Sequence, residues 1–273
     1  MAKRKTIDYE INRLKNWDMW DEEYNKSLPI EDVEITSHDN FKLKGHLIEN
    51  HKENNKYVIL VHGYSAHYSI HMPFVKMFQD MDFNVLLVEQ RAHGDSEGIY
   101  TSYGYNEAKD LNLWIEFLEK RRGEKLYIGL HGQSMGAAAV MICGAHNDKV
   151  KFVVEDCGYF SAKEQIKYEF SKTKYAFFTL VYWYLNLKVK IKCKFNFEEA
   201  DPMREILKSN VPIFFVHGDK DKKVPYEMCL NMYNKRHGVK DKILIVKDAG
   251  HLESYYKEPF KYTRAIKEFL NEI

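Results

Sequence analysis

The sequence predicts an α/β fold with a mostly parallel central sheet and helices on both of its faces. Six short apolar runs recur along the 273-residue chain, and helical patterns separate them. Each run is too short for a buried helix and apolar on both faces, as the central strands of a parallel sheet must be. Strands that alternate with helices form βαβ units, so helices should cover both sides of this sheet. The predicted strands span residues 57–61, 83–88, 126–130, 152–154, 213–216 and 243–246.

Two elements precede these strands. Residues 7–27 carry apolar side chains near helical spacing and Pro29 ends the run, which predicts one amphipathic helix in an N-terminal segment, residues 1–29. In residues 33–48 the apolar period shortens toward two on either side of the turn residues His38-Asp39-Asn40. This pattern predicts an antiparallel hairpin at the start of the sheet.

Two of the helices between the strands have clear signals. Apolar residues at helical spacing in residues 108–118 lead to Gly123, and glycine is common just beyond a helix C-terminus. Residues 135–145 contain almost no polar side chain, so a helix there must be buried.

One segment is too long for this pattern. About 56 residues separate Asp156 from Ile213, far more than a single crossover helix requires. We therefore predict a helical cap, residues 161–200, inserted between two parts of the α/β core at residues 30–160 and 201–273.

The predicted cap contains an aromatic run, residues 175–185, and a series of lysines. The lysines are Lys188, Lys190, Lys192 and Lys194. A helix over the aromatic run would present one apolar face to an acyl chain, and that face holds Phe178, Val181, Tyr182 and Leu185. We expect the aromatic side chains to close a substrate pocket and the lysines to keep an exposed edge soluble. The alternative is a membrane-surface element, with aromatic side chains at the interface and lysines on the headgroups.

Composition and charge exclude several functions. With 41 Lys and Arg against 40 Asp and Glu, the formal net charge is +1, so no global field attracts nucleic acid. The four cysteines show no CxxC or other paired spacing, which predicts free thiols in a cytoplasmic protein. The basic amino terminus is not followed by an apolar stretch, so no secretion signal is expected. The most apolar stretch, residues 175–187, is too short to span a bilayer.

A GxSxG pattern identifies a candidate nucleophile. Gly132-Gln133-Ser134-Met135-Gly136 follows the strand predicted at 126–130 and opens the helix predicted at 135–145. Strand, sharp turn and helix are the context of a nucleophile elbow, and the flanking glycines leave room for the crowded turn. Ser134 is therefore the expected nucleophile, and a serine hydroxyl needs a base to activate it.

The expected base and acid lie in loops after two later strands. His251 follows the strand at 243–246, and Asp221 follows the strand at 213–216. We expect His251 to be the base and Asp221 to orient it, while Asp219 shapes the turn. Asp156, at the end of the fourth strand, is the alternative acid.

Chain order and position support this assignment. Ser134, Asp221 and His251 occur in the Ser, Asp, His order, each just beyond the carboxyl end of a predicted strand, where open α/β sheets place their sites. The oxyanion needs two donors, for which we expect the backbone N–H groups of Met135 and Tyr64. The Tyr64 ring either covers the pocket or packs against the core.

Together these segments resemble the α/β-hydrolase superfamily, in its branch of cap-bearing serine esterases and prolyl-oligopeptidase-like enzymes, over roughly residues 30–272. The resemblance is carried by His62-Gly63-Tyr64, by residues 91–96 (RAHGDS), by 132–136 (GQSMG), by 217–225 (HGDKDKKVP) and by 249–251 (AGH). Two features depart from the pattern: Glu89-Gln90 stands where relatives often carry Asp and another residue, and Ala92 replaces the usual glycine. Both concern a loop and leave the triad intact.

The resemblance implies hydrolysis but says little about the substrate, because esters, thioesters, amides and lactones are all cleaved on this fold. We expect a carboxylesterase that acts on small to medium acyl esters through an acyl-enzyme on Ser134, with the small-molecule ester as its partner. The alternatives are a short-peptide or aminoacyl peptidase, a lysophospholipase or monoacylglycerol lipase, and a thioesterase. Such peptidases usually carry a separate gating domain, for which 273 residues leave no space. A ligand-binding protein on a hydrolase fold is the non-enzyme alternative, and the sequence does not define the oligomeric state.

No cofactor or metal is expected. The chain contains neither a GxxxxGK[ST] phosphate loop nor a GxGxxG dinucleotide fingerprint. His67 and His71 are four residues apart, but no third ligand accompanies them.

Overall fold

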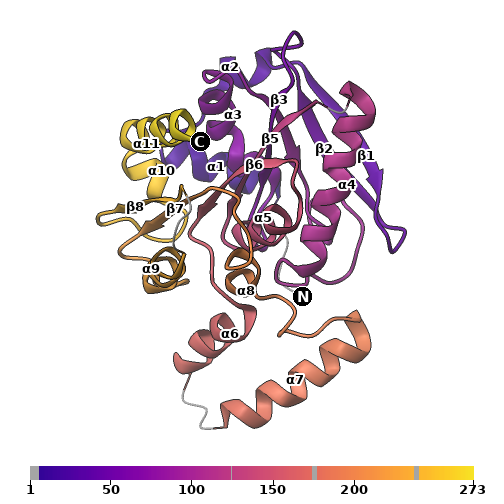
Figure 1. The fold of residues 1–273 in the computed structure, drawn as a ribbon, viewed down its shortest axis with the longest axis vertical. Coiled ribbons are helices and arrows are strands. Elements are labelled where there is room, and N and C mark those ends of the chain that lie inside the picture. Colours follow the sequence, from indigo (N-terminus) through magenta and orange to yellow (C-terminus); the bar gives the residue numbers. More distant parts are fainter. Residues whose placement is uncertain (1–5, 124, 174–176, 237–239) are drawn as a thin grey trace.

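An eight-stranded sheet runs through the middle of the computed structural model (Figure 1), which describes residues 6–123, 125–173, 177–236 and 240–273. Its strand order is β1-β2-β4-β3-β5-β6-β7-β8. β2 pairs antiparallel with β1 and β4, and every other neighbouring pair is parallel. The predicted mostly parallel sheet with an N-terminal antiparallel hairpin is therefore confirmed. The strands are β1 (Ile30–Thr36), β2 (Lys42–Ile48), β3 (Lys56–Val61), β4 (Asn84–Val88), β5 (Tyr127–Gln133), β6 (Val150–Asp156), β7 (Ile213–Gly218) and β8 (Lys242–Val246).

Helices cover both faces of the sheet, and each face has its own apolar core. On one face, side chains such as Trp114 and Phe215 pack among α4 (Tyr105–Arg122), α5 (Met135–His146), α8 (Pro202–Ile206) and α9 (Tyr226–Lys235). On the other, α3 (Met72–Gln79) and α11 (Pro259–Glu272) pack around residues such as Phe78 and Phe152. The short helices η1 (Tyr68–His71) and α10 (Ser254–Lys257) precede α3 and α11. Burial on both faces explains why β3 and β4 are apolar along almost their whole length.

The N-terminal segment forms two helices instead of the single helix predicted over residues 7–27. α1 (Ile7–Asn16) ends just before Trp17, and α2 (Glu22–Ser27) begins after Asp21. The Asp21 carboxylate accepts a hydrogen bond from the Tyr24 N–H at 2.9 Å, so it caps a new helix and interrupts the first. The apolar spacing continues across this break and gave no sign of it.

Two helices occupy the region predicted as the cap. α6 (Ala162–Ser171) and α7 (Phe178–Cys193) project from the end of the molecule farthest from α2 and β3 (Figure 1). Tyr175 and Ala176, at the start of the predicted aromatic run, lie outside the described residues. The inner side of α7 joins a small apolar cluster that contains Ile166, Tyr182, Phe195 and Phe197 and is separate from both sheet cores.

Within the described ranges, no helix combines the length and the apolar character needed to cross a bilayer.

Candidate active site

The turn between β5 and α5 holds Ser134 in an unusual backbone conformation. Its φ is 56° and its ψ is −116°, which lies outside the regions that L-residues favour. The neighbouring glycines make this turn possible: a Cβ at Gly136 would lie 2.0 Å from the carbonyl oxygen of Val61, and one at Gly132 would lie 2.4 Å from that of Gly136. Gly136 is thus required by its close packing against the end of β3, and Gly132 by the close approach of the first turn of α5.

Three loops beyond the ends of β5, β7 and β8 bring the predicted triad residues together. Ser134 Oγ lies 3.0 Å from Nε2 of His251, and Nδ1 of His251 lies 2.7 Å from Oδ2 of Asp221. The other oxygen of Asp221 accepts the backbone N–H groups of Lys223 and Val224 at 2.7 and 2.9 Å. These contacts fix the carboxylate, which in turn fixes the imidazole ring.

The two competing carboxylates have other partners. Asp219 accepts the Asp248 N–H at 2.7 Å, so it holds the loop that carries His251 against the loop that carries Asp221. Asp156 is buried and accepts hydrogen bonds from Gln133 Nε2 at 2.9 Å and from the Tyr262 hydroxyl at 3.3 Å. Asp156 therefore stabilises the turn that carries Ser134 through its contact with Gln133, and Asp221 is the carboxylate next to His251.

The pKa shifts of the triad residues favour an uncharged His251 beside an ionised Asp221. Burial lowers the pKa of His251 and outweighs the opposing effect of Asp221. Burial opposes ionisation of Asp221, but hydrogen bonds from His217 and His251 outweigh it and hold the pKa of Asp221 below its ordinary value. At neutral pH, His251 is thus free to accept a proton from Ser134.

A second histidine, which the sequence analysis left without a role, also contacts Asp221. His217 is fully buried at the end of β7, and its Nε2 lies 3.2 Å from Asp221 Oδ2 and 3.0 Å from the Val224 carbonyl oxygen. Burial opposes protonation of His217, but the hydrogen bond to Asp221 and the charges of Glu155 and Asp221 raise its pKa. Burial raises the pKa of Glu155 to about 7. His217 is the first residue of the motif at 217–225, so the sequence did mark its position. The sequence could not show that His217 is buried beside Glu155.

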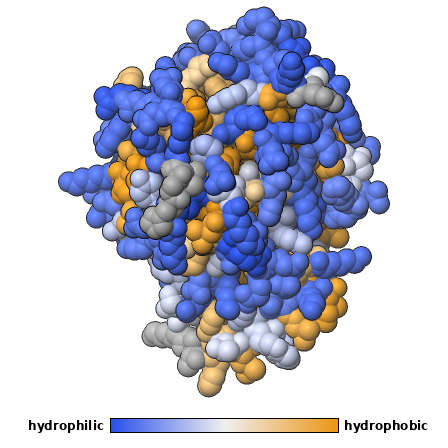
Figure 2. Space-filling model, in the orientation of Figure 1, coloured by the Kyte–Doolittle hydropathy of each residue, from blue (hydrophilic) through white to orange (hydrophobic). Residues whose placement is uncertain are grey.

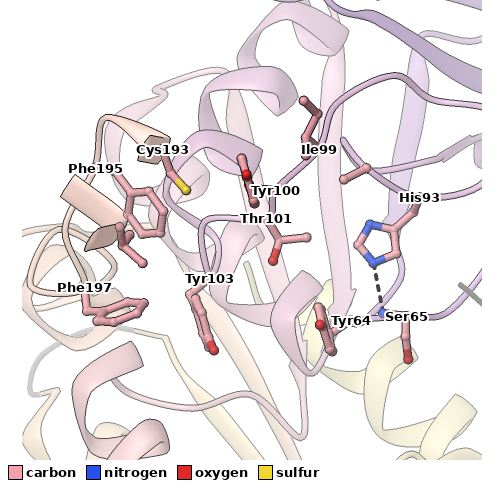
Figure 3. A pocket seen from close by; sticks show the side chains of 12 residues that line it. Tyr64, Ser65, His93, Ile99, Tyr100, Thr101, Tyr103, Cys193, Phe195 and Phe197 are labelled. Atoms are coloured by element: carbon pink, nitrogen blue, oxygen red, sulfur yellow. Dashed lines mark hydrogen bonds between the residues drawn. The ribbon is translucent and has the colours of Figure 1, made fainter. Parts of the chain in front are cut away.

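The loop after β3 lies directly over Ser134. A Cβ at Gly63 would lie 3.1 Å from that of Ser134, so the backbone before Tyr64 is adjacent to the nucleophile. His93 positions this loop, since its Nδ1 donates to the Arg91 carbonyl oxygen at 2.9 Å while its Nε2 accepts the Ser65 N–H at 2.9 Å (Figure 3). The second expected donor, Met135, is the first residue of α5, where N–H groups lack intrahelical partners. Gly63 and Met135, the neighbours of Tyr64 and of Ser134 in the chain, thus both lie at this turn, and the N–H groups of Tyr64 and Met135 remain the expected oxyanion donors.

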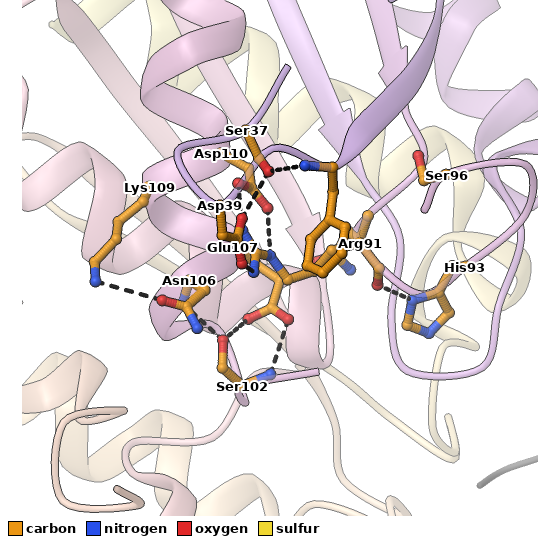
Figure 4. A network of polar contacts seen from close by, with 12 residues as sticks. Ser37, Asp39, Arg91, His93, Ser96, Ser102, Asn106, Glu107, Lys109 and Asp110 are labelled. Carbon is orange, nitrogen blue, oxygen red and sulfur yellow. Dashed lines mark hydrogen bonds and ion pairs between the residues drawn. The ribbon is translucent and has the colours of Figure 1, made fainter. Parts of the chain in front are cut away.

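The loop after β4 contains the two departures from the family pattern. Arg91 forms a bidentate ion pair with Asp110, at 2.6 and 2.7 Å, and also contacts Asp39 at 2.9 Å (Figure 4). This network anchors the loop to α4 and to the β1–β2 turn. Ala92 follows with a φ of 62°, a conformation that glycine adopts without strain. Glu89 is buried and accepts the Asp95 N–H, which closes the same loop.

A cavity of about 490 Å³ extends from this site toward the end of α7 (Figure 3). Tyr64 lines it, half exposed, at the end next to Ser134, which itself is not among the lining residues. The insert contributes four lining residues, Val189, Cys193, Phe195 and Phe197, and the remaining lining residues come from the loops after β3 and β4.

The four cap residues expected to bind substrate, Phe178, Val181, Tyr182 and Leu185, do not line this cavity. Phe178, Tyr182 and Leu185 pack inside the insert's own cluster, where Tyr182 lies 5.8 Å from Phe197 between ring centres. The physical reason is that the chain after α7 folds back beneath the helix and covers this face. The insert residues that line the cavity are therefore nearer to the C-terminal end of α7 than the face that the helical spacing predicted.

Two groups of three side chains in the described part of the chain have metal-ligand spacing. One is Glu155, His217 and Cys229, and the other is Cys157, Asp221 and His251. In both groups burial raises the pKa of the cysteine well above its ordinary value, so the thiol holds its proton and is a poor ligand.

Comparisons with known proteins agree with this geometry. The chain is 30% identical over 239 residues to the uncharacterized protein YqkD of Bacillus subtilis, covering 85% of this chain and 76% of that protein. The esterase Pf2001 of Pyrococcus furiosus superposes with a TM-score of 0.72 and 25% identity over 93% of this chain and 96% of its own. The acylaminoacyl peptidase of Pyrococcus horikoshii shares the fold, with a TM-score of 0.69 and 18% identity, over 91% of this chain and 42% of its own.

The neighbours are α/β-hydrolases and the sheet has the corresponding topology, so the resemblance inferred from the sequence is confirmed. The model of the prolyl oligopeptidase family matches residues 71–273, which include Ser134, Asp221, His251 and the insert. The chain belongs to the prolyl oligopeptidase family and is an α/β-hydrolase.

Proposed function

We propose that the protein is a carboxylesterase that cleaves esters of small to medium acyl chains through an acyl-enzyme on Ser134. The observation that carries this proposal is the continuous contact from Ser134 Oγ to His251 Nε2 at 3.0 Å and from His251 Nδ1 to Asp221 at 2.7 Å. The esterase among the structural neighbours, which matches over nearly its whole length, supports an ester substrate.

In the proposed reaction, Ser134 Oγ attacks the ester carbonyl carbon while His251 Nε2 takes the hydroxyl proton. Asp221 keeps the His251 proton on Nδ1 and stabilises the imidazolium that forms. The N–H groups of Tyr64 and Met135 donate to the oxyanion. His251 then gives its proton to the leaving alcohol, and a water molecule activated by the same imidazole hydrolyses the acyl-enzyme and restores Ser134.

The cavity beside Tyr64 is the proposed acyl pocket. Its lining is mainly apolar and aromatic, and its volume of about 490 Å³ falls in the range of small-molecule sites. Val189 and Cys193 on α7, with Phe195 and Phe197 after it, take the role that the sequence analysis gave to other α7 residues.

Covalent labelling tests the nucleophile. A fluorophosphonate probe needs both an activated serine and an oxyanion site, so it should modify the wild-type protein at Ser134 and leave Ser134→Ala unlabelled. A label on another serine, or no label on folded protein, would refute the assignment. Rates on p-nitrophenyl esters and on aminoacyl amides, measured side by side, separate the esterase from a peptidase.

The location is proposed to be cytoplasmic. The four cysteines are free, and three of them are buried, which suits a reducing compartment.

A further inference from the structure

Helix α7 is apolar on two opposite sides, and only one of them is covered. Its inner side holds Tyr182 and Leu185 against the insert's own cluster and Val189 against the cavity. Its outer side is exposed to solvent and is formed by Leu180 (67% exposed), Trp183 (61%), Tyr184 (50%), Leu187 (41%) and Ile191 (71%). These five residues, here called the outer face, fall within one stripe along the helix at helical spacing, with Trp183 and Tyr184 side by side across it.

The outer face lies at one end of the molecule. Figure 1 shows α7 lying across this end, beyond α6 and α8 and away from the sheet. Figure 2 shows apolar and near-neutral residues gathered at the same end, whereas hydrophilic residues dominate the rest of the visible surface. A broad, flat surface could therefore reach the outer face without meeting the α/β core.

Lysines border the outer face on both sides. At helical spacing, Lys188 and Lys192 fall on one border and Lys190 on the other. α7 carries no acidic residue, and the nearby acids pair elsewhere: Glu164 with Lys167, Glu169 with Lys172 and Glu198 with Lys163. In the parts of the chain that the structure describes, Lys188, Lys190 and Lys192 have no ion pair, and Lys188 lies over the Tyr184 ring at 4.5 Å. The chain as a whole has a net charge of only +1, so this concentration of positive charge is local.

We propose that the outer face of α7 docks the protein on an anionic lipid surface. An exposed stripe of Leu, Ile, Trp and Tyr bordered by lysines is the pattern of a helix that lies in the membrane interface, with its apolar side chains at the acyl boundary and its cations on the headgroups. A second copy of this chain fits less well, because a two-fold contact would bring the lysine borders of two helices together with no acid on either helix. The proposal is independent of the proposed ester hydrolysis.

Docking by the outer face would leave α7 between the lipid and the cavity. Val189 and Cys193, which line the cavity, lie on the same helix as the outer face and one turn from Ile191 or less. A docked protein would therefore hold this cavity, on the inner side of the same helix, about one helix diameter from the headgroup region.

Flotation of the full-length protein with vesicles tests the proposal. Vesicles of phosphatidylcholine with 30% phosphatidylglycerol should bind the protein, and vesicles of phosphatidylcholine alone should bind it much more weakly. The combined variant Lys188→Gln, Lys190→Gln, Lys192→Gln should bind the anionic vesicles about a hundredfold more weakly, because each lysine near such a surface contributes about a fivefold factor. A matched variant on α10 and α11, away from α7 (Figure 1), is Lys257→Gln, Lys261→Gln, Lys267→Gln, and it should bind like the wild type.

A second pair of variants tests the contribution of the apolar side chains of the outer face to vesicle binding. Leu180→Ser with Ile191→Ser should lose most vesicle binding, whereas Leu207→Ser with Phe260→Ser, which alters two exposed apolar residues elsewhere, should not. Lipids brominated on their acyl chains should quench tryptophan fluorescence in the wild type, and Trp183→Phe should abolish that quenching. Ser134→Ala should bind like the wild type, so that failure of the hydrolase proposal does not affect this test.

Three results would overturn the proposal. The first is no binding to anionic vesicles by the folded protein. The second is binding that the lysine variant leaves unchanged. The third is a dimer in sedimentation velocity that dissociates in Leu180→Ser with Ile191→Ser while vesicles remain unbound, which would assign the outer face to a second copy of this chain.

Discussion

Nε2 of His217 lies 3.2 Å from Oδ2 of Asp221, the same carboxylate oxygen that His251 contacts at 2.7 Å. Two histidines therefore contact the carboxylate of Asp221, and of these two only His251 also contacts Ser134. His217 is a positioning residue in this arrangement, since it acts on the base through the carboxylate. In its protonated form His217 also lowers the pKa of His251, by less than burial and Lys223 do, whereas Asp221 raises it.

His217→Gln should raise the pKa that governs activity. Glutamine keeps an N–H donor for Asp221 but removes the charge, so protonated His251 becomes easier to form. The acid limb of the kcat/KM profile should then move to higher pH, with kcat on the plateau reduced less than tenfold. Ester hydrolysis between pH 4.5 and 9 measures this shift. An unchanged acid limb with a lowered plateau would reduce His217 to a packing role.

The pH dependence of kcat/KM in the wild type follows from the protonation state of His251. The neutral imidazole is the active base, and burial lowers its pKa below the ordinary 6.5, so the active form persists to lower pH. We expect kcat/KM to rise with pH through one titration below 6.5 and then to level off. The substrate must be one whose acylation limits the rate. A midpoint above pH 7 would contradict the burial effect, and a flat profile from pH 4 to 8 would exclude His251 as the base.

Asp221→Asn should lower kcat by three to four orders of magnitude while the protein stays folded, because the amide leaves the imidazole in the wrong tautomer. Asp156→Asn is the matched control, since Asp156 lies under the turn and contacts Gln133 and Tyr262. We expect that change to lower stability and to leave kcat within tenfold. If the two variants behave in the opposite way, Asp156 is the acid.

The strands and the triad loops were predictable because their signals are local. A buried parallel strand is apolar along its length, and the GxSxG glycines are needed where backbones touch, as Gly136 shows against Val61. The break near Asp21 was not predictable, because the apolar spacing continues through it. The position of α7 was also not predictable: both of its sides are apolar, and which side meets Phe197 depends on how the chain folds back after the helix.

Ala92→Gly should raise the free energy of unfolding by about 0.5 to 1 kcal/mol. Ala92 has a φ of 62°, where an alanine is strained and a glycine is not. Ala108→Gly, in the first turn of α4, is the control and should lower the free energy of unfolding by about 1 kcal/mol. Denaturant unfolding of the two variants measures both changes. Equal losses of stability in the two variants would show that the loop gains nothing from a glycine at position 92.

The acyl-chain preference should respond to Val189 and not to Val181. Both valines lie on α7 and both are partly exposed, but only Val189 lines the cavity beside Tyr64. In the wild type, each methylene buried in the cavity contributes up to about 0.8 kcal/mol, so kcat/KM should grow by up to about fourfold per added CH₂ until the cavity is full. Val189→Phe fills part of that space, and the optimum along a series of p-nitrophenyl esters from acetate to decanoate should move to shorter chains. Val181→Phe adds the same bulk outside the cavity and should keep the wild-type optimum. If the chain-length optimum shifts in Val181→Phe and not in Val189→Phe, the acyl chain binds to the α7 face that contains Val181, as the sequence predicted.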